Sequence, residues 1–293
     1  MNLVMGLREL QMGSKYMTEL KDSTNIKDDF NSLRQRMAED GYLFIRGFHD
    51  RMQVLKARNE YLAEMQQAGK LAPGTPMEDG IIGLENKGAG SQGANLDHPE
   101  LLALVNSQAV MQFFDSFLGG PSLTYDHKWL RAVANGDFSG AHYDIVYMGR
   151  GTRNLYTVWT PLGDIPFEMG GLAICLGSQN FEKIKQTYGQ MDVDRDNVTG
   201  WFSNDPVEII DNFGGQWATT EFQAGDALIF GMYTMHASLT NTTNRYRISV
   251  DTRYQLASDP VDERWIGNKP KGHYAWRQGK TVSMEEARKQ WGV

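Results

Sequence analysis

The N-terminal half of the chain carries apolar residues at helical spacing. Phe30, Leu33 and Met37 follow one another at intervals of three and four, so they share one face of a helix that Asp40-Gly41 ends. An apolar run of four residues comes next and indicates a short buried strand. This half as a whole predicts helices over about 28–40, 52–65 and 99–117, and a strand over 42–45.

From Ser122 onward the pattern changes to short segments rich in β-branched and aromatic residues. About eight of these segments are predicted to be strands, over residues 123–133, 141–148, 155–161, 172–176, 216–222, 226–230, 232–237 and 246–254. Helices followed by strands favour helices packed outside one antiparallel barrel rather than alternating βαβ units. The predicted fold class is therefore mainly β with flanking helices, a double-stranded β-helix (jelly roll, cupin-like) barrel with its core at about 122–255.

A single catalytic domain over 28–293 is expected, because a chain of this length can bury a large core. Residues 1–27 are Met-rich and polar without clear periodicity, which predicts a poorly ordered or adaptable N-terminal extension. Residues 68–98 carry seven glycines and little periodicity, so they are a candidate lid. Near the C-terminus, Ser283 and Glu286 predict a capping box at the start of a helix.

Composition narrows the range of functions. A net charge of −7 argues against a nucleic-acid surface, because phosphate binding needs an excess of clustered Lys and Arg. No apolar run approaches the roughly 20 residues that cross a bilayer, and a signal-peptide pattern is lacking, so a cytoplasmic protein with no membrane contact is expected. Cys175 is the only cysteine, which excludes intrachain disulfides and cysteine-rich zinc sites. Any metal must therefore use His and carboxylate ligands.

The central candidate site is the segment Gly140-Ala141-His142-Tyr143-Asp144. Residues two apart on a strand face the same side, so His142 and Asp144 are expected to project together into the barrel. His-x-Asp alone is a weak signal that also occurs by chance. A later strand carries His236, and two histidines with one carboxylate on one face of an iron leave three adjacent positions open. Those positions suffice for a bidentate 2-oxo acid and dioxygen.

Such a site also needs a cation for the distal carboxylate of a 2-oxo diacid, and a guanidinium can hold a carboxylate with two parallel hydrogen bonds. Arg247 is the candidate. On its strand Arg247, Ser249 and Asp251 are polar, whereas the residues between them are apolar, so one polar face is expected to line the barrel lumen. Ser238, two residues after the distal histidine, is expected to add a hydroxyl; the alternative is an ordinary strand serine.

These residues resemble the phytanoyl-CoA dioxygenase family, over roughly residues 35–255. In that family a His-x-Asp pair, a distal His, a Ser two residues on and an Arg eleven residues on bind iron and 2-oxoglutarate. The matching positions here are His142, Asp144, His236, Ser238 and Arg247. The stretch 158–164 followed by 170–172 is similar to a strand-turn-strand of the family, in which Trp159 matches an aromatic residue near the co-substrate. One departure is Leu176-Gly177-Ser178-Gln179, where the family has Pro-Gly-Ser-His.

The resemblance implies an Fe(II)- and 2-oxoglutarate-dependent dioxygenase. Such an enzyme uses O2 to hydroxylate, or otherwise oxidise, a small or medium organic substrate while 2-oxoglutarate is decarboxylated to succinate. The presence of Asp144 favours hydroxylation over halogenation, because halogenating relatives lack this carboxylate. The implied metal ligands are His142, Asp144 and His236, and the implied co-substrate residues are Arg247, Ser238, Trp159 and Thr157.

Several basic residues flank the metal motif in sequence and motivate a hypothesis about the substrate. A small molecule bearing a carboxylate, phosphate or phosphonate would suit them, although solvated charges at the barrel rim explain them equally well. The candidate substrate residues are Lys128, Arg131, Tyr147, Arg150 and Arg153. The pattern indicates no particular oligomeric state.

Three alternatives stay open at this point. The first is a metal-dependent hydrolase using the same three ligands, and the second is a non-catalytic ligand-binding barrel. The third is a nicotinamide enzyme using the glycine-rich loop at 88–93, although no strand leads into that loop. Asp192, Asp194 and Asp196 imitate the start of a calcium loop, but the glycine and glutamate that such a loop needs are missing, so a solvated acidic loop is expected.

Overall fold

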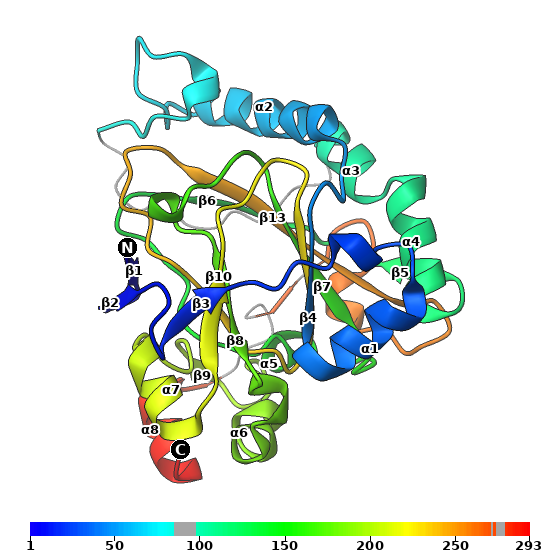
Figure 1. The fold of residues 1–293 in the computed structure, drawn as a ribbon, viewed down its shortest axis with the longest axis vertical. Helices are drawn as coiled ribbons and strands as arrows, with labels where there is room; N and C mark the ends of the chain where they lie inside the picture. The colour runs from blue at the N-terminus through cyan, green and yellow to red at the C-terminus, as the bar shows by residue number, and fades with distance from the viewer. Residues whose placement is uncertain (85–97, 271, 274–278) are drawn as a thin grey trace.

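The computed structural model describes the chain except for residues 85–97, 271 and 274–278. Two sheets form the barrel (Figure 1). The larger sheet has the order β4 (Tyr42–Ile45), β11 (Ala227–Gly231), β7 (Tyr156–Pro161), β13 (Arg247–Leu256) and β5 (Ser122–Thr124), and β6 (Trp129–Val133) also pairs with β13. The smaller sheet has the order β12 (His236–Ser238), β8 (Leu172–Leu176), β10 (Gln216–Thr219) and β3 (Met17–Glu19). This is the arrangement of the predicted double-stranded β-helix.

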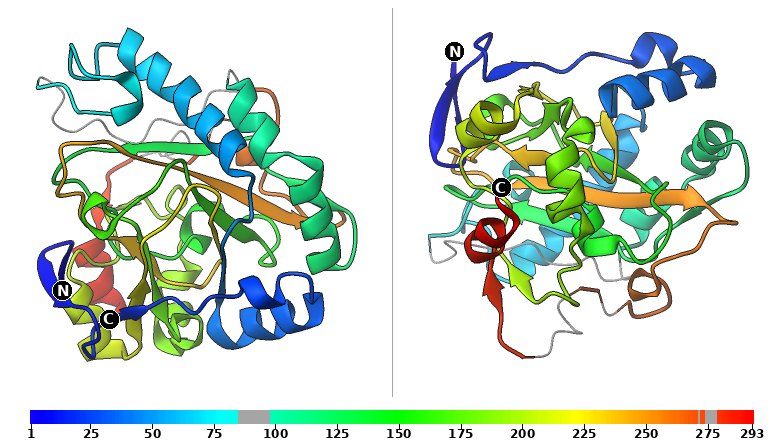
Figure 2. Two further views of the ribbon diagram at one scale, coloured as in Figure 1. Left: turned by 45° about the horizontal axis from the view of Figure 1, so that its top comes forward. Right: turned by 90° about the horizontal axis from the view of Figure 1, so that it is seen from below.

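Four helices cover the outer face of the larger sheet (Figure 2). They are α1 (Phe30–Asp40), α2 (Arg51–Gln67), α3 (Pro99–Val105) and α4 (Gln108–Leu118). The side chains of β13 alternate: Ile248 and Val250 pack in one apolar cluster with α2 and α3, and Tyr254 packs with α1 and α4. The odd-numbered residues of β13 therefore face the lumen, as the sequence predicts.

The segment 99–117, predicted as one helix, is interrupted and forms two helices. Ser107 caps α4 by accepting a hydrogen bond from the Val110 amide, so α3 ends before it. Residues Pro99–Leu118 are long and apolar enough to cross a membrane by length and composition alone. In this fold, however, they are two helices that bury Leu104 and Phe114 in the apolar core.

The prediction of a poorly ordered extension over 1–27 is wrong. β1 (Asn2–Met5) and β2 (Arg8–Gln11) form an antiparallel hairpin, and β3 pairs in parallel with β10 of the barrel. Leu3, Met5, Leu10 and Met17 are buried. These three strands are too short to show an alternation of apolar and polar residues. Their stability comes from burial against the barrel rather than from local β propensity.

The predicted strand over 141–148 is also wrong beyond its first two residues. Ala141 and His142 make single bridges to Ser203 and His236, and α5 (Ile145–Met148) follows. Asp144 already has helical backbone angles, φ −69° and ψ −26°. The chain therefore leaves the sheet between the two residues of the His-x-Asp motif.

The remaining elements lie at the end of the barrel that carries the C-terminus (Figure 1). They are α6 (Glu182–Gln186), β9 (Val198–Thr199), α7 (Pro206–Phe213), β14 (Val282–Ser283) and α8 (Met284–Trp291). The predicted capping box between Ser283 and Glu286 is present at the start of α8. Residues 85–97 of the candidate lid, which include the glycine-rich loop at 88–93, lie outside the described residues.

Candidate active site

The two histidines of the candidate site are joined through their backbones. The His142 amide donates to the His236 carbonyl and the His236 amide donates to the His142 carbonyl, both at 3.1 Å. His236 begins β12, which is anchored to β8 with Ile174 opposite it. The pairing brings the two imidazole ring centres to 4.1 Å.

The outer nitrogen of each ring is fixed by a backbone carbonyl. His142 Nδ1 lies 2.8 Å from the Gly140 carbonyl oxygen, and His236 Nδ1 lies 3.0 Å from that of Thr234. A carbonyl oxygen can only accept, so each Nδ1 carries the proton and each Nε2 presents a lone pair. Donation of this kind orients histidines that bind metals.

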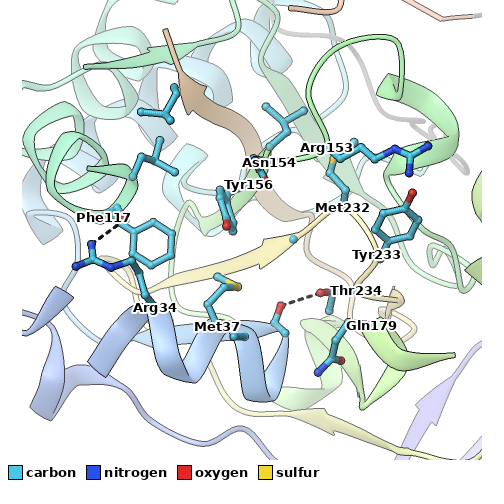
Figure 3. Close-up of a pocket in the computed structure, with 16 residues that line it drawn as sticks. Arg34, Met37, Phe117, Arg153, Asn154, Tyr156, Gln179, Met232, Tyr233 and Thr234 are labelled. Carbon is cyan, nitrogen blue, oxygen red and sulfur yellow. Dashed lines mark hydrogen bonds between the residues drawn. The ribbon is translucent and has the colours of Figure 1, made fainter. Parts of the chain in front are cut away.

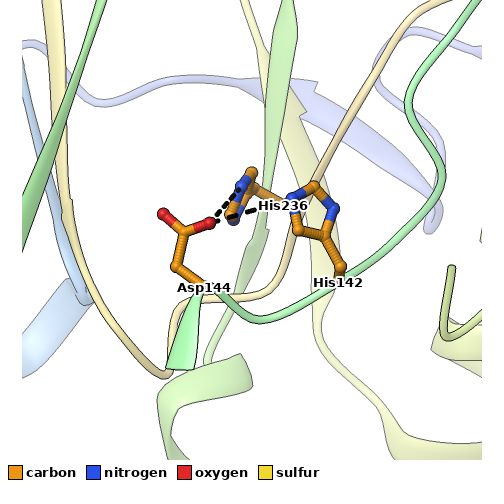
Figure 4. Close-up of side chains that lie close together, drawn as sticks. All are labelled: His142, Asp144 and His236. Carbon is orange, nitrogen blue, oxygen red and sulfur yellow. Dashed lines mark ion pairs between the residues drawn. The ribbon is translucent and has the colours of Figure 1, made fainter. Parts of the chain in front are cut away.

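Asp144 completes the group. Its Oδ1 lies 3.9 Å from His142 Nε2 and 3.7 Å from His236 Nε2, as the dashed lines in Figure 4 show. One ligand atom from each residue falls within 4.8 Å of the other two. Two imidazoles and a carboxylate converging in this way fit an Fe(II) ion with open positions on one side.

Burial sets the charges of these groups. Desolvation, followed by the neighbouring His236, holds the pKa of His142 well below its usual value, and desolvation also lowers the pKa of His236. Burial on its own would raise the pKa of Asp144, but the charge of Arg253 and then those of the two histidines outweigh it, so this pKa lies below its usual value. Neutral imidazoles and an ionised carboxylate are the forms that bind a divalent metal.

Arg247 is a buried cation that forms no ion pair with any residue that the structure describes. Its side chain is 1% exposed, and its Nη1 donates to Ser249 Oγ at 2.5 Å. Among the residues that the structure describes, none accepts from its Nε, and none forms an ion pair with it. Desolvation, with the like charge of Arg131, lowers its pKa to about 10, so it stays charged at neutral pH. A buried charge of this kind favours the binding of an anionic ligand.

The other predicted co-substrate residues have different surroundings. Trp159 is buried, with its ring centre 6.0 Å from the guanidinium carbon of Arg247. Ser238 is buried, and its hydroxyl oxygen accepts from the Ser139 amide at 2.9 Å. Thr157 donates to Asp144 Oδ2 at 2.5 Å, so its hydroxyl contacts the proposed metal ligand.

Two of the candidate substrate residues lie by the site. The Tyr147 ring centre is 5.8 Å from that of His142. Arg131 faces the lumen from β6, opposite Ser249, and its Nε donates to Asp251 Oδ2 at 2.6 Å. Both residues therefore belong to the region around the three ligands.

Lys128 and Arg150 have hydrogen-bond partners away from the three proposed metal ligands. Lys128 is buried, and its ammonium donates to Thr124 Oγ1 at 2.7 Å and to the Tyr125 carbonyl at 2.5 Å. Arg150 makes two hydrogen bonds to Asp192, at 2.6 and 2.9 Å. Neither contact directs a cation toward the metal ligands.

Arg153 lines an outer groove of about 550 Å³ (Figure 3). The groove runs between α1 and the loop after β11, and Met37, Tyr156 and Met232 contribute to its walls. The lining includes none of the three proposed metal ligands. The structure thus separates Arg153 from the candidate active site.

The predicted solvated acidic loop is wrong for two of its three residues. Asp192 and Asp194 are buried, at 7% and 4% exposure. Asp192 pairs with Arg150, and Asp194 accepts from Arg264 Nη1 at 2.6 Å. The paired arginines allow these carboxylates to be buried.

Two functional candidates were missed at the level of sequence. Ser249 accepts from Arg247, and Arg253 Nη2 lies 3.1 Å from Asp144 Oδ2. The signal for both is the same alternation that identified Arg247, because both are odd-numbered residues of β13. No local pattern connects Arg253 with Asp144, because Asp144 lies 109 residues earlier in the chain.

Comparison with known proteins agrees with this arrangement. A 1-deoxypentalenic acid 11-beta-hydroxylase of Streptomyces arenae is 26% identical over 264 residues, which are 82% of this chain and 86% of that protein. The corresponding hydroxylase of Streptomyces exfoliatus is 25% identical over 83% of this chain and 87% of its own.

Solved structures share the fold. The non-haem α-ketoglutarate-dependent epimerase SnoN of nogalamycin biosynthesis has a TM-score of 0.55 at 18% identity, covering 87% of this chain and 96% of its own. EctD from S. alaskensis, solved with 2-oxoglutarate and 5-hydroxyectoine, has a TM-score of 0.56 at 17% identity, covering 86% and 85%. The predicted fold class is confirmed.

Residues 37–249 match the family described as phytanoyl-CoA dioxygenase (PhyH). This family and the hydroxylase relatives confirm the predicted class of enzyme, a 2-oxoglutarate-dependent iron dioxygenase acting on a small molecule, and the His–Asp–His group fits its iron. The chain belongs to the phytanoyl-CoA dioxygenase family.

Proposed function

We propose that His142, Asp144 and His236 hold Fe(II), that Arg247 anchors 2-oxoglutarate, and that the enzyme hydroxylates a small organic acid. The observation that carries the proposal is the meeting of three metal-binding side chains, with ligand atoms within 4.8 Å of one another, in a barrel that also buries Arg247, which has no ion-pair partner among the described residues. The histidines bind through Nε2, since each Nδ1 is committed to a carbonyl.

The protein groups bind, orient and exclude water. When bound, iron supplies the activation of dioxygen that the organic side chains lack. Arg247 receives the distal carboxylate of 2-oxoglutarate, and Ser249 holds the guanidinium in place from two residues further along β13. Trp159 lies beside the guanidinium of Arg247 and closes one side of this subsite. We propose that Ser238, two residues after His236, adds a hydroxyl. Burial of all these groups keeps bulk water from the reacting atoms.

An acidic substrate is supported by two observations. Both Streptomyces relatives are named for 1-deoxypentalenic acid. Arg131 is a lumen-facing cation whose side chain is 22% exposed, so a ligand carboxylate can reach it beside Asp251. Tyr147 offers an aromatic wall next to His142. A cytoplasmic location stays a prediction from the sequence.

The test is an anaerobic titration of the apo protein with Fe(II) and then 2-oxoglutarate. A visible charge-transfer band that requires both additions is expected in the wild type and lost in Asp144→Ala. Asp211→Ala, which removes an exposed carboxylate of α7 paired with Lys15, is the control and should behave as the wild type. A folded, metal-loaded wild type without the band would instead favour a hydrolase.

The substrate is tested separately by succinate release in air. Compact cyclic carboxylic acids are expected to stimulate release, and their methyl esters are expected to stimulate it less. The preference should disappear in Arg131→Met. Equal stimulation by acids and esters would contradict the acidic substrate while leaving the iron and 2-oxoglutarate assignments intact.

A further inference from the structure

The two oxygens of the Asp144 carboxylate have different surroundings. Oδ1 faces both imidazoles, at 3.7 and 3.9 Å from their Nε2 atoms. Oδ2 accepts from Thr157 Oγ1 at 2.5 Å and lies 3.1 Å from Arg253 Nη2. Figure 4 shows the same division, with one oxygen directed to the histidines and the other turned away from them. Only Oδ1 is therefore presented to a metal.

The two groups that hold Oδ2 come from adjacent strands. Thr157 on β7 and Arg253 on β13 are direct partners in the antiparallel register. Their side chains lie on the lumen face of the sheet, and cross-strand partners on one face lie about 5 Å apart. Sheet register thus delivers a hydroxyl and a guanidinium to the same carboxylate oxygen.

Arg253 is itself held on several sides. It is 2% exposed, its Nη1 donates to the Thr252 carbonyl at 3.3 Å, and its guanidinium carbon lies 4.4 Å from the ring centre of Trp129. Its Nε contacts Met148 Sδ at 3.1 Å. Met148 ends α5, the short helix that begins directly after Asp144, so the same guanidinium contacts both ends of the segment that carries the carboxylate.

We propose that Thr157 and Arg253 are positioning residues that restrict Asp144 to binding the metal through Oδ1 alone. The inference rests on the proposed function, because it takes Asp144 as an iron ligand. A six-coordinate iron with three protein donors keeps three positions, two for 2-oxoglutarate and one for dioxygen. A carboxylate binding through both oxygens would occupy one of those three positions. Thr157 and Arg253 prevent this by satisfying Oδ2.

Loss of either partner leaves Oδ2 buried without its full set of donors. A desolvated carboxylate oxygen that lacks a donor is costly, and a bound metal can then attract it. The carboxylate is therefore expected to turn and offer both oxygens to the metal, or to bind it with the wrong orientation. Removal of such outer contacts typically weakens metal binding about 10-fold to 100-fold.

The test uses the apo protein loaded anaerobically with Co(II), whose d–d absorption reports the number and arrangement of its ligands, or with Fe(II) and 2-oxoglutarate. Thr157→Val and Arg253→Met are the test variants, and Thr157→Ser restores the hydroxyl. Thr160→Val is the matched control, because Thr160 lies on the same strand but bonds to His49 on the other face.

In Thr157→Val and Arg253→Met we expect Co(II) affinity to fall about 10-fold to 100-fold. The d–d spectrum should change, and the charge-transfer band with 2-oxoglutarate should shift or weaken. Thr157→Ser and Thr160→Val should match the wild type in all three readouts. A purely structural role for Thr157 would lower the melting temperature without changing the spectrum of the bound metal.

Wild-type spectra and affinities in both test variants would overturn the inference while leaving the proposed function standing. If Arg253→Met fails to fold, the pair Thr157→Val and Thr157→Ser decides the question. A wild type that forms no charge-transfer band would overturn the proposed function and this inference with it.

Discussion

His142 and His236 form one antiparallel backbone pair, in which each residue donates to and accepts from the other at 3.1 Å. The pair closes the barrel between the segment before α5 and the start of β12. Because backbone groups make these bonds, the separation of the two rings does not depend on a metal ion. The site is thus built before the metal arrives, which is the arrangement that favours precise coordination.

A first prediction follows for His142→Ala. Metal affinity should fall at least about 100-fold, since one of three ligands is lost, while the backbone pairing that involves this position is retained. The melting temperature of the apo protein should therefore change little. Co(II) titration and thermal unfolding followed by circular dichroism measure the two effects.

His98→Ala is the matched control, because His98 is also a buried histidine but contacts Glu64 of α2, so its loss should leave metal affinity unchanged. Unfolding of apo His142→Ala would contradict a site that is built by the backbone. Unchanged metal affinity would remove His142 from the ligand set.

The second prediction concerns Arg247. Arg247→Met should raise the 2-oxoglutarate concentration needed for half of the charge-transfer band by roughly 100-fold, since a charge-assisted hydrogen bond contributes about 1.5 to 3 kcal/mol and the pair makes more than one. Fe(II) affinity should be unchanged, because Arg247 touches none of the three ligands in the described structure.

Arg245→Met provides the comparison for this experiment. Arg245 precedes Arg247 by two residues but is exposed and lies 3.8 Å from Asp79. It should leave 2-oxoglutarate binding as in the wild type. If both variants bound 2-oxoglutarate equally weakly, the overall positive charge of the region, rather than the buried guanidinium of Arg247, would attract the co-substrate.

The residues that line the barrel lumen could be predicted because polar and apolar residues alternate along the strands in the sequence. On β13 the alternation of polar and apolar residues correctly placed Arg247 inward and Ile248 outward. The two-residue spacing in His-x-Asp predicted that these two side chains would lie together, and they do, but not on one strand, since Asp144 precedes a helix. Convergence there comes from the backbone pairing with His236, which is far away in sequence.

Other parts of the structure depend on partners that no local pattern reveals. The strand β3 exists because β10 lies beside it, and Met17 is buried only in that pairing. Arg150 was predicted to bind substrate because it lies near the metal motif in sequence. In the fold it donates a hydrogen bond to Asp192, which is 42 residues away in the chain. Long-range charge pairing of this kind has no periodicity, so it was visible only in the fold.

The third prediction concerns the buried charges around Arg264. Arg264 is 4% exposed, and it donates from Nη1 to Asp194 and from Nη2 and Nε to Asp262, at 2.5 to 2.9 Å. Arg264→Met would leave two buried carboxylates without this cation, which should lower the free energy of unfolding by roughly 3 to 5 kcal/mol. Urea denaturation at neutral pH measures the change.

An exposed pair gives the contrast. Arg195 contacts Asp196 at 2.6 Å with its side chain 62% exposed, and such surface pairs contribute at most about 1 kcal/mol. Arg195→Met should therefore unfold close to the wild type. If both variants lost a similar amount of unfolding free energy, burial of the Arg264 ion pairs would not increase their contribution to stability.

The fourth prediction is a pH dependence that comes from His49. This side chain is 7% exposed, its Nε2 lies 3.1 Å from Thr160 Oγ1, and burial lowers its pKa from 6.5 to about 4. Between these two values the unfolded chain binds a proton that the folded protein does not, so His49 makes stability fall as the pH is lowered from about 6.5 toward 4. The loss should approach about 3 kcal/mol, since each pKa unit corresponds to about 1.4 kcal/mol.

His49→Gln keeps a hydrogen-bonding side chain that does not titrate, so it isolates this contribution from the carboxylates that titrate in the same range. Urea unfolding of both proteins at intervals from pH 7 to 4 should show the wild type losing stability more steeply, with the difference concentrated below about pH 6.5. Parallel profiles would mean that His49 is protonated as readily in the fold as in the unfolded chain. In that case the Thr160 contact would have to hold an imidazolium, and the lowered pKa of His49 would be wrong.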